Sequence, residues 1–260
     1  MLNIEIEGGV ARVTLDRPEV RNAFDDALIR KLQSTFETLA KDASVRVVVL
    51  AGNGPAFCAG ADLNWMKRMA GYGYAENLAD AQTLATMLAT LDRLPQPTIA
   101  RVHGPAFAGG TGLVAACDIA VGTPEAKFCF SEAKLGLSPA TISPYVIRAI
   151  GERMARHYFL TAEVFGADEA LRTGLLSALV PAANLESAID DLLKHLLAGG
   201  PEAHVKIKHL IRAVTGRQVD DALSADTAKR IAEIRVSPEG REGIASFLEK
   251  RRAYWCSPKS

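Results

Sequence analysis

The sequence predicts an α/β fold with a parallel sheet, followed by a helical C-terminal region. Two observations support this prediction. In the first part of the chain, short apolar runs alternate with stretches whose apolar residues recur at helical spacing, as in strands joined by crossover helices. From about Leu185 the pattern changes to helix after helix.

The first elements can be assigned in order. Residues 2–7 and 10–15 are expected to form a strand pair joined at the turn dipeptide Gly8-Gly9. A helix should follow, because five apolar residues recur at helical spacing: Phe24, Leu28, Leu32, Phe36 and Leu39. Residues 45–51 form an almost wholly apolar run rich in valine, as expected of a strand buried on both faces.

The same alternation continues to residue 121. A glycine-containing loop follows the valine-rich run, and a helical stretch is expected from about Ala75 to Leu94, ended by Pro95 and Pro97. The later segments are a buried strand at 98–102, a loop of small residues at 104–112, a helix near 109–116 and a strand at 119–121. Strands and helices in this order predict parallel pairing.

A helix start is visible near the C-terminal end of the sequence. Ser237-Pro238-Glu239 offers a serine N-cap, a proline at the first helical position and an acid in the first turn. The helix that it opens carries Ile244, Phe247 and Leu248 on one face. We therefore expect an α/β core domain over residues 1–184 and a helical region over residues 185–260.

The composition argues against several classes of protein. With 48% hydrophobic residues among 260, the chain can bury a large core without a metal or disulfides. The 30 basic residues balance the 30 acidic ones, which does not favour nucleic-acid binding. Four scattered cysteines predict reduced thiols. We expect no signal peptide and no membrane span, and hence a cytoplasmic protein.

Two loops of small residues are candidates for a functional site. They cover residues 55–62 and 104–112, and each follows a predicted buried strand, where α/β sheets place their ligands. Small residues let backbone N–H groups approach a ligand closely. Two N–H groups converging on one oxygen would stabilise a thioester carbonyl as it becomes an enolate. Glycines also serve turns and tight helix packing, but two such loops in adjacent units favour a site.

A rival pattern overlaps the second loop. Residues 110–115 fit the dinucleotide-binding pattern G-x-G-x-x-A, with Glu132 roughly 20 residues on. The context argues against this interpretation, because residues 104–108 separate the strand from these glycines and Glu132 falls well beyond the next strand. No H-E-x-x-H, G-x-S-x-G or Walker pattern occurs, and we expect no metal.

Glu132 is the candidate acid. Its neighbours are largely apolar, and a carboxylate in such surroundings tends toward a raised pKa, which suits proton transfer near neutrality. The alternative is a surface glutamate paired with Lys127 or Lys134.

Several motifs occur in order along the chain. They are Leu15–Pro18 with Asn22–Phe24, Phe57–Asp62, Gly104–Gly112 running on to Cys117–Ala120, Phe128–Glu132 with Leu135-Gly136, Ala167–Leu175 and Phe247–Arg251. With these motifs the chain resembles the enoyl-CoA hydratase/isomerase (crotonase) superfamily over nearly its whole length. Residues 62–66, 142–146 and 237–242 carry a closer likeness to bacterial hydratases of branched, glutaconyl-type substrates, such as 3-methylglutaconyl-CoA and isohexenylglutaconyl-CoA.

The resemblance implies a fold and a site. The fold is a spiral of ββα units over residues 1–184, with a helical C-terminal trimerisation region and assembly into trimers or dimers of trimers. The oxyanion donors are the N–H groups of Ala59 and Gly109, and Glu132 is the acid/base. The implied contacts with coenzyme A are Ala59, Gly60, Ala61 and Asp62, with Lys250 or Arg251 at its phosphates. Coenzyme A enters as part of the substrate, and no other cofactor is implied.

The chain departs from the family at two positions. The first of two family glutamates is replaced by Gly112, and the first glycine of the usual triplet is Ala108. We expect reversible hydration of an α,β-unsaturated acyl-CoA by Glu132 alone, with the attacking water in the space beside Gly112. Double-bond isomerisation by the same residues is the alternative. Some relatives also bind RNA, but the neutral charge balance argues against that role here.

Overall fold

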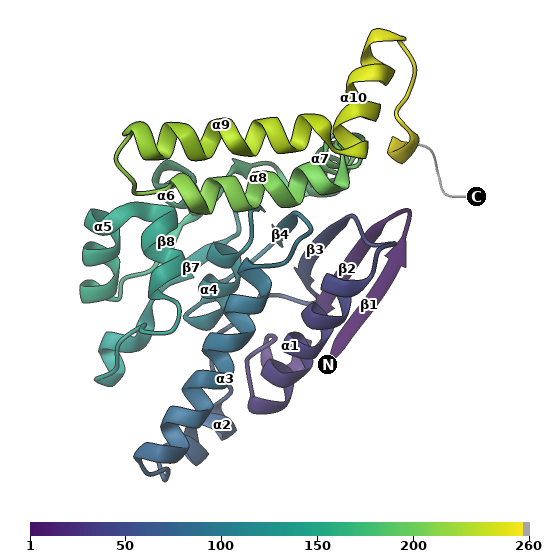
Figure 1. Ribbon diagram of the computed structural model, residues 1–260. Helices are drawn as coiled ribbons and strands as arrows, with labels where there is room; N and C mark the ends of the chain where they lie inside the picture. The colour runs from purple at the N-terminus through teal and green to yellow at the C-terminus, as the bar shows by residue number, and fades with distance from the viewer. Residues whose placement is uncertain (257–260) are drawn as a thin grey trace.

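The computed structural model describes residues 1–256 and has the expected α/β fold (Figure 1). A six-stranded sheet has the order β1-β2-β3-β4-β6-β9. Its strands are β1 (Leu2–Glu7), β2 (Val10–Leu15), β3 (Val47–Gly52), β4 (Thr98–Val102), β6 (Ile119–Gly122) and β9 (Ala178–Leu179). β1 and β2 are antiparallel, and the remaining neighbours are parallel, as predicted.

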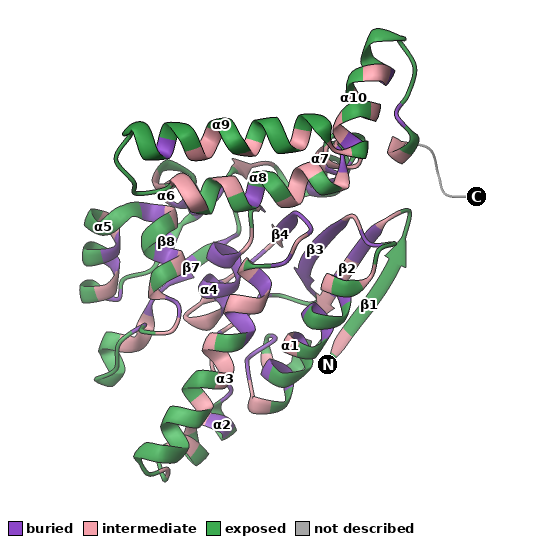
Figure 2. Cartoon of the chain, in the orientation of Figure 1, coloured by how far each residue is buried: buried purple, intermediate pink, exposed green. Residues whose placement is uncertain are grey.

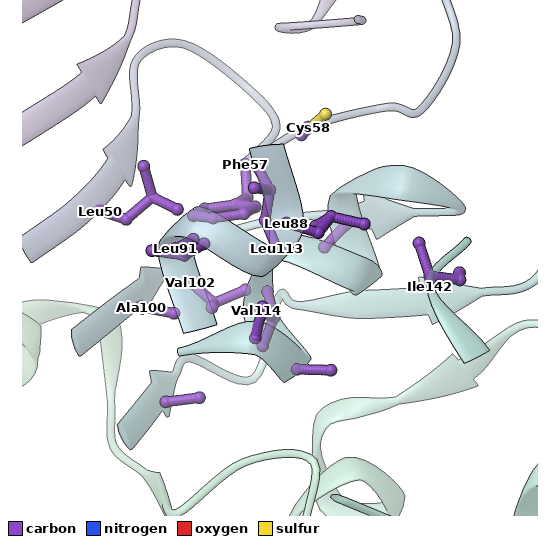
Figure 3. Close-up of a cluster of buried hydrophobic side chains, with 14 of the residues drawn as sticks. Leu50, Phe57, Cys58, Leu88, Leu91, Ala100, Val102, Leu113, Val114 and Ile142 are labelled. Atoms are coloured by element: carbon purple, nitrogen blue, oxygen red, sulfur yellow. The ribbon is translucent and has the colours of Figure 1, made fainter. Parts of the chain in front are cut away.

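Two apolar layers cover the two faces of this sheet. One face packs against α1 (Asp26–Lys41), α3 (Tyr74–Asp92) and α4 (Gly109–Ala116). Figure 3 shows part of this layer, where Leu50 lies beside Leu91, and Val102 lies beside Val114 of α4. The other face packs against α7 (Leu185–Ala198). All six residues of β3 are buried, as its valine-rich sequence predicts.

A second sheet is not visible in the sequence pattern. It consists of β5 (Ala106–Phe107), β7 (Lys127–Cys129) and β8 (Phe165–Gly166), in that order. Strands of two or three residues are too short to show an alternating pattern. Aromatic contacts hold this sheet in place, since the ring of Phe165 stacks on those of Phe128 and Tyr158 at centroid distances of 5.6 and 4.1 Å. This small sheet positions the candidate site.

The first helix begins later than its periodicity predicts. α1 starts at Asp26, and the Asp25 side chain caps it by accepting a hydrogen bond from the Leu28 N–H at 2.7 Å. Phe24 therefore lies outside the helix and forms an isolated parallel bridge with Ala61. Phe24 is buried beside the apolar residues of α1, which explains why the sequence pattern included it in the helix.

The C-terminal helices are α8 (Pro201–Val214), α9 (Asp221–Val236) and α10 (Pro238–Leu248). The predicted start of α10 is confirmed, because the Ser237 hydroxyl accepts a hydrogen bond from the Gly240 N–H at 3.0 Å. Glu239, predicted to act in the first turn of its own helix, is buried and accepts from the N–H groups of Glu202 and Ala203 instead. It thereby caps α8.

Helix follows helix from Leu185 onward, as predicted, but α7 belongs to the packing of the large sheet. Figure 2 shows that α9 and α10 are largely exposed. The division into domains at 184/185 stays a prediction, and residues 257–260 of its second part lie outside the described residues.

The remaining elements lie elsewhere within residues 1–256. They are α2 (Leu63–Met69), α5 (Ser143–Thr161), α6 (Ala167–Thr173) and four short 3₁₀ helices at Pro18–Val20, Ser131–Leu135, Ala182–Asn184 and Tyr254–Cys256. Among residues 1–256, no helix combines the length and apolar character that crossing a membrane requires.

Candidate functional site

Three segments run parallel to one another beside α4. Cys58 forms a parallel bridge with Ala106 of β5, and Ala106 pairs in parallel with Phe128 of β7. Parallel segments in register end at the same edge, so the residues that follow them emerge together. The residues three or four positions further on are Ala61, Gly109 and Glu132. The topology thus brings both predicted loops and the predicted acid to one edge.

The backbone N–H of Ala61 points into this edge. Phe24 pairs with the neighbours of Ala61: its N–H donates to the Gly60 carbonyl at 2.6 Å, and its carbonyl accepts from the Asp62 N–H at 2.7 Å. A residue flanked in this way in a parallel pair directs its own N–H to the opposite side. β5 lies close by, since a side chain on Gly60 would lie 3.3 Å from Ala108 Cβ. Within residues 1–256 the Ala61 N–H donates to no acceptor.

The N–H of Gly109 is also available. Gly109 is the first residue of α4, so its N–H has no acceptor within the helix, and it donates to none elsewhere in the described chain. The preceding residue, Ala108, has φ 47° and ψ −116°, a conformation that glycine adopts more readily. The Ala108 N–H donates to the Cys129 carbonyl at 2.8 Å, which holds this strained residue on β7. The start of α4 is therefore fixed relative to the segment that carries Glu132.

Glu132 is half-buried, and one of its carboxylate oxygens has no partner within residues 1–256. It lies in the 3₁₀ helix Ser131–Leu135 that follows β7. Its Oε2 is buried and has no hydrogen-bond partner among residues 1–256. Burial raises the pKa of the Glu132 carboxyl, and a backbone hydrogen bond offsets this only in part. In the described chain Glu132 forms no ion pair with Lys127 or Lys134, the alternative that the sequence left open. Such an unpaired buried acid is typical of a functional group.

The space beside Gly112 is filled. A Cβ on Gly112 would lie 2.3 Å from Ile142 Cγ2 and 2.9 Å from Ile142 Cβ. Ile142 is 2% exposed and directly precedes α5. The prediction that Gly112 leaves room for the attacking water is therefore wrong, because Ile142 occupies that room with hydrocarbon. In this chain the absence of a side chain at 112 allows close packing between α4 and the segment that follows Glu132.

Two of the predicted coenzyme A contacts have other partners. The Ala59 N–H donates to the Arg21 carbonyl at 2.9 Å, which argues against its predicted role as an oxyanion donor. The Asp62 carboxylate caps α2 through the N–H groups of Asn64 and Trp65, at 2.8 and 3.3 Å, and pairs with Arg17 at 3.2 Å. Of the four residues in this stretch, Ala61 has the backbone donor best placed to meet a ligand. The family resemblance implies for Ala61 only a contact with coenzyme A, so its role as a donor emerges from the fold.

The two predicted basic residues lie elsewhere. Arg251 pairs with Glu242 and Glu249, each at 2.6 Å, and these partners raise the pKa of its guanidinium. Lys250 follows α10 with a positive φ of 54° and is exposed. Figure 1 places α10 beyond the end of α8, away from α4 and β7. Within one chain, these residues are therefore not brought together with Glu132.

The rival dinucleotide pattern has the wrong local structure. Residues 110–115 lie inside α4 rather than in a turn between a strand and a helix, and Gly110 packs so closely on the Cys58 carbonyl that a Cβ would lie 2.4 Å from it. No cluster of three or more His, Cys, Asp or Glu residues suited to a metal exists among residues 1–256. A cavity of about 380 Å³ lies on the α7 side of the sheet, but its arginines, Arg12 and Arg101, both pair with Glu186.

The sequence and the fold are similar to those of known proteins. The family model "Enoyl-CoA hydratase/isomerase" matches residues 5–258. The chain is 33% identical over 257 residues to a hydroxycinnamoyl-CoA hydratase-lyase from Pseudomonas fluorescens, a match covering 96% of this chain and 92% of the relative.

Two solved structures have nearly the same fold. One is an enoyl-CoA hydratase from Shewanella pealeana, with 42% identity, coverage of 98% of this chain and 95% of that one, and a TM-score of 0.95. The other is AtuE from Pseudomonas aeruginosa, with 35% identity, coverage of 98% and 99%, and a TM-score of 0.94. These matches span nearly the whole chain, including the α/β core and the helical C-terminal region. The chain therefore belongs to the enoyl-CoA hydratase/isomerase family.

Proposed function

We propose that this protein catalyses the reversible hydration of an α,β-unsaturated acyl-coenzyme A thioester. The proposal rests chiefly on the Glu132 carboxylate: among residues 1–256 its buried oxygen has no partner, and it lies at the edge where the N–H groups of Ala61 and Gly109 have no acceptor. An acid with a raised pKa beside two convergent backbone donors is suited to proton transfer on a carbon next to a thioester carbonyl.

The proposed reaction uses three groups of the chain. The thioester oxygen accepts hydrogen bonds from Ala61 and Gly109, and these bonds stabilise the negative charge that develops on it as an enolate forms. Glu132 removes a proton from water, whose oxygen bonds to the β-carbon. Glu132 then returns the proton to the α-carbon on the same face. Water is thus added across the double bond, and no metal or redox cofactor takes part.

Isomerisation is the second candidate. The observation that favours it is the packing of Ile142 against Gly112, which places hydrocarbon where a second acid would otherwise lie. A single carboxylate is sufficient to take a proton from one carbon of a 3-enoyl thioester and deliver it to another, while the same two N–H groups stabilise the enolate.

The substrate is proposed to be a branched or glutaconyl-type thioester. The support for this is the resemblance of residues 62–66, 142–146 and 237–242 to hydratases of such substrates. Backbone groups of residues 59–62 are proposed to lie along the coenzyme A moiety, with Ala61 closest to the thioester. Lys250 and Arg251 are proposed to reach coenzyme A phosphates across a subunit contact, because α10 extends away from the site of its own chain.

We also propose assembly into trimers or dimers of trimers. The support is an apolar face of α10, on which Ile244 and Phe247 are 51% and 80% exposed. Phe247→Asp should then give a smaller particle in analytical ultracentrifugation. A variant that sediments like the unaltered protein would exclude α10 from the contact.

A panel of thioesters in heavy water tests the function. Crotonyl-CoA, 3-methylglutaconyl-CoA and a 3-enoyl-CoA are incubated with the enzyme, and loss of the conjugated enoyl absorbance is followed. Hydration predicts a 3-hydroxyacyl product with one deuterium at the α-carbon, syn to the new hydroxyl. Conversion of the 3-enoyl to the 2-enoyl thioester with no hydroxyacyl product would overturn hydration in favour of isomerisation. Inactivity on every thioester would overturn both.

A further inference from the structure

The guanidinium of Arg17 connects the chain segments on both sides of the Phe24–Ala61 pairing. Its Nη1 donates to the Ala23 carbonyl at 3.0 Å and pairs with Asp25 Oδ2 at 2.9 Å. Its Nη2 pairs with Asp62 Oδ2 at 3.2 Å. Ala23 and Asp25 flank Phe24, and Asp62 directly follows Ala61. One side chain therefore holds the two chain segments whose pairing directs the Ala61 N–H.

Both acidic partners of Arg17 are also helix caps. The other oxygen of Asp25 accepts from the Leu28 N–H at the start of α1, and the other oxygen of Asp62 accepts from the Asn64 N–H at the start of α2. The side chains of Arg17 and Asp62 are only 17% and 8% exposed, so water screens this pair weakly. The starts of two helices and the two segments joined by the Phe24–Ala61 bridge thus meet around one guanidinium.

Phe24 contacts the segments that carry both N–H donors, Ala61 and Gly109. Its backbone bonds to Gly60 and Asp62 on either side of Ala61. Its ring lies against Gly109, where a Cβ would approach Phe24 Cε2 to 2.6 Å. A displacement of Phe24 would therefore disturb both N–H groups at once. Arg17 holds Phe24 through the residues before and after it.

We infer that Arg17 is a positioning residue that sets the spacing and direction of the Ala61 and Gly109 N–H groups through Phe24. This inference rests on the proposed function, because it assumes that these two donors bind the thioester oxygen. Arg17 touches no substrate and transfers no proton. Loss of the Arg17 contacts leaves Glu132 unchanged but misdirects the two N–H donors. Stabilisation of the enolate then falls more than binding of the thioester substrate does. The effect falls on turnover more than on substrate affinity.

The test compares Arg17→Met and Arg17→Lys with a matched pair at Arg68. Arg68 also connects α2 to the start of α1, through Asp26 at 2.6 Å, but within residues 1–256 it forms no hydrogen bond or ion pair with Phe24 or residues 59–62. Displacing catalytic groups by about 1 Å costs on the order of 10²-fold. We therefore expect Arg17→Met to lower kcat by about 10- to 100-fold, with KM changed by less than about threefold. Arg17→Lys keeps the charge and should lose less. The Arg68 variants should keep their turnover.

Two readouts separate positioning from simple destabilisation. The acid limb of the kcat–pH profile should stay in place in the Arg17 variants, because Glu132 is outside this network. A conjugated probe, 2,4-hexadienoyl-CoA, should show a red-shifted absorbance when bound, because the two N–H groups polarise its carbonyl. We expect this shift to shrink in Arg17→Met and to persist in Glu132→Gln and in the Arg68 variants. If Arg17→Met does not fold, the same two measurements are made on Arg17→Lys.

Three results would count against the inference. A folded Arg17→Met that keeps full turnover and the full red shift would overturn it alone. Equal losses in the Arg17 and Arg68 variants would show that tying α1 to α2 is sufficient, which also overturns it. No red shift in the unaltered enzyme would overturn the proposed function of the two donors first, and this inference with it.

Discussion

Asp62 and Glu132 are carboxylates at the same edge of the molecule, and they differ in what surrounds them. Asp62 is 7% exposed, and both of its oxygens are engaged, one by helix N–H groups and the other by Arg17. Glu132 has a raised pKa and a buried oxygen that finds no partner in the described part of the chain. Burial alone therefore does not mark a catalytic acid. The presence or absence of compensating partners does.

The largest expected effect concerns Glu132. Glu132→Gln keeps the shape of the side chain and removes the proton carrier, so turnover should fall by at least about 10²-fold, the range of a lost general acid/base. Binding of the substrate thioester should change little, because the coenzyme A contacts and both N–H donors remain. Steady-state kinetics and calorimetric titration measure the two quantities.

A matched control for this variant is Glu125→Gln. Glu125 precedes β7, the strand that Glu132 follows, and it is exposed. The hydroxyl of Thr123 lowers the pKa of the Glu125 carboxyl, whereas burial raises that of Glu132. The Glu125→Gln variant should keep the full turnover of the unaltered protein. If Glu132→Gln were as active as the control, the unpaired carboxylate would have no catalytic role.

A second carboxylate at this edge would test how closely the surroundings of Glu132 are packed. Gly112→Glu introduces a Cβ where Ile142 Cγ2 would lie 2.3 Å away. Such overpacking typically costs about 1–3 kcal/mol of stability. It should also displace the segment that follows Glu132 and lower turnover by roughly tenfold or more, since small displacements of catalytic groups are costly.

The double variant Gly112→Glu/Ile142→Ala removes the obstacle and should recover most of the lost stability. Thermal unfolding and kinetics of the single and double variants measure the coupling between the two positions. Equal losses in both would mean that Ile142 does not fill the space beside Gly112.

For Asp62 the pattern should be reversed, with a larger effect on stability than on turnover. Asp62→Asn keeps a capping oxygen for α2 but leaves Arg17 with one acidic partner, Asp25. Breaking a buried ion pair costs up to about 3–5 kcal/mol, and the remaining pair should hold the loss to roughly 2–3 kcal/mol. Turnover should fall by less than about tenfold. A loss of activity as large as that of Glu132→Gln, without loss of stability, would remove the distinction between the two acids.

The sequence predicts much of the fold because its signals are local. The valine-rich run became β3, the small-residue loops follow adjacent strands, and the serine N-cap starts α10. The short strands β5 and β7 were not predicted, because two or three residues show no periodicity. Their pairing is what brings Glu132 to the two loops, so the sequence predicts which loops and which acid to consider but not how the fold arranges them.

The individual atoms of the site were harder to predict. Ala59 and Ala61 are the same residue type two positions apart, and only the pairing with Arg21 and Phe24 decides which N–H is free. Likewise, the glycine at 112 suggests empty space when only the sequence is considered. In the fold, Ile142 from 30 residues away fills that space. Such facts depend on long-range contacts, which a single sequence does not encode in any local pattern.

The smallest expected effect is a pH-dependent gain in the stability of Glu132→Gln over that of the unaltered protein. This gain tests the burial of Glu132 without an activity assay. Burial raises the pKa of this carboxyl above its usual value of 4.5, so the folded chain holds the proton more tightly than the unfolded chain. Above the raised pKa, folding bears the cost of the buried charge. As the pH falls below 4.5, both states become protonated and the cost disappears. Glu132→Gln, which is never charged, should therefore melt at a higher temperature than the unaltered protein at about pH 7.5, and this difference should shrink as the solution is acidified. Calorimetry at a series of pH values measures the difference, with Glu125→Gln as the exposed control. Melting curves of the Glu132→Gln and unaltered proteins that coincide at every pH would indicate a hydrated carboxylate, and the contrast between Glu132 and Asp62 would then lose its physical basis.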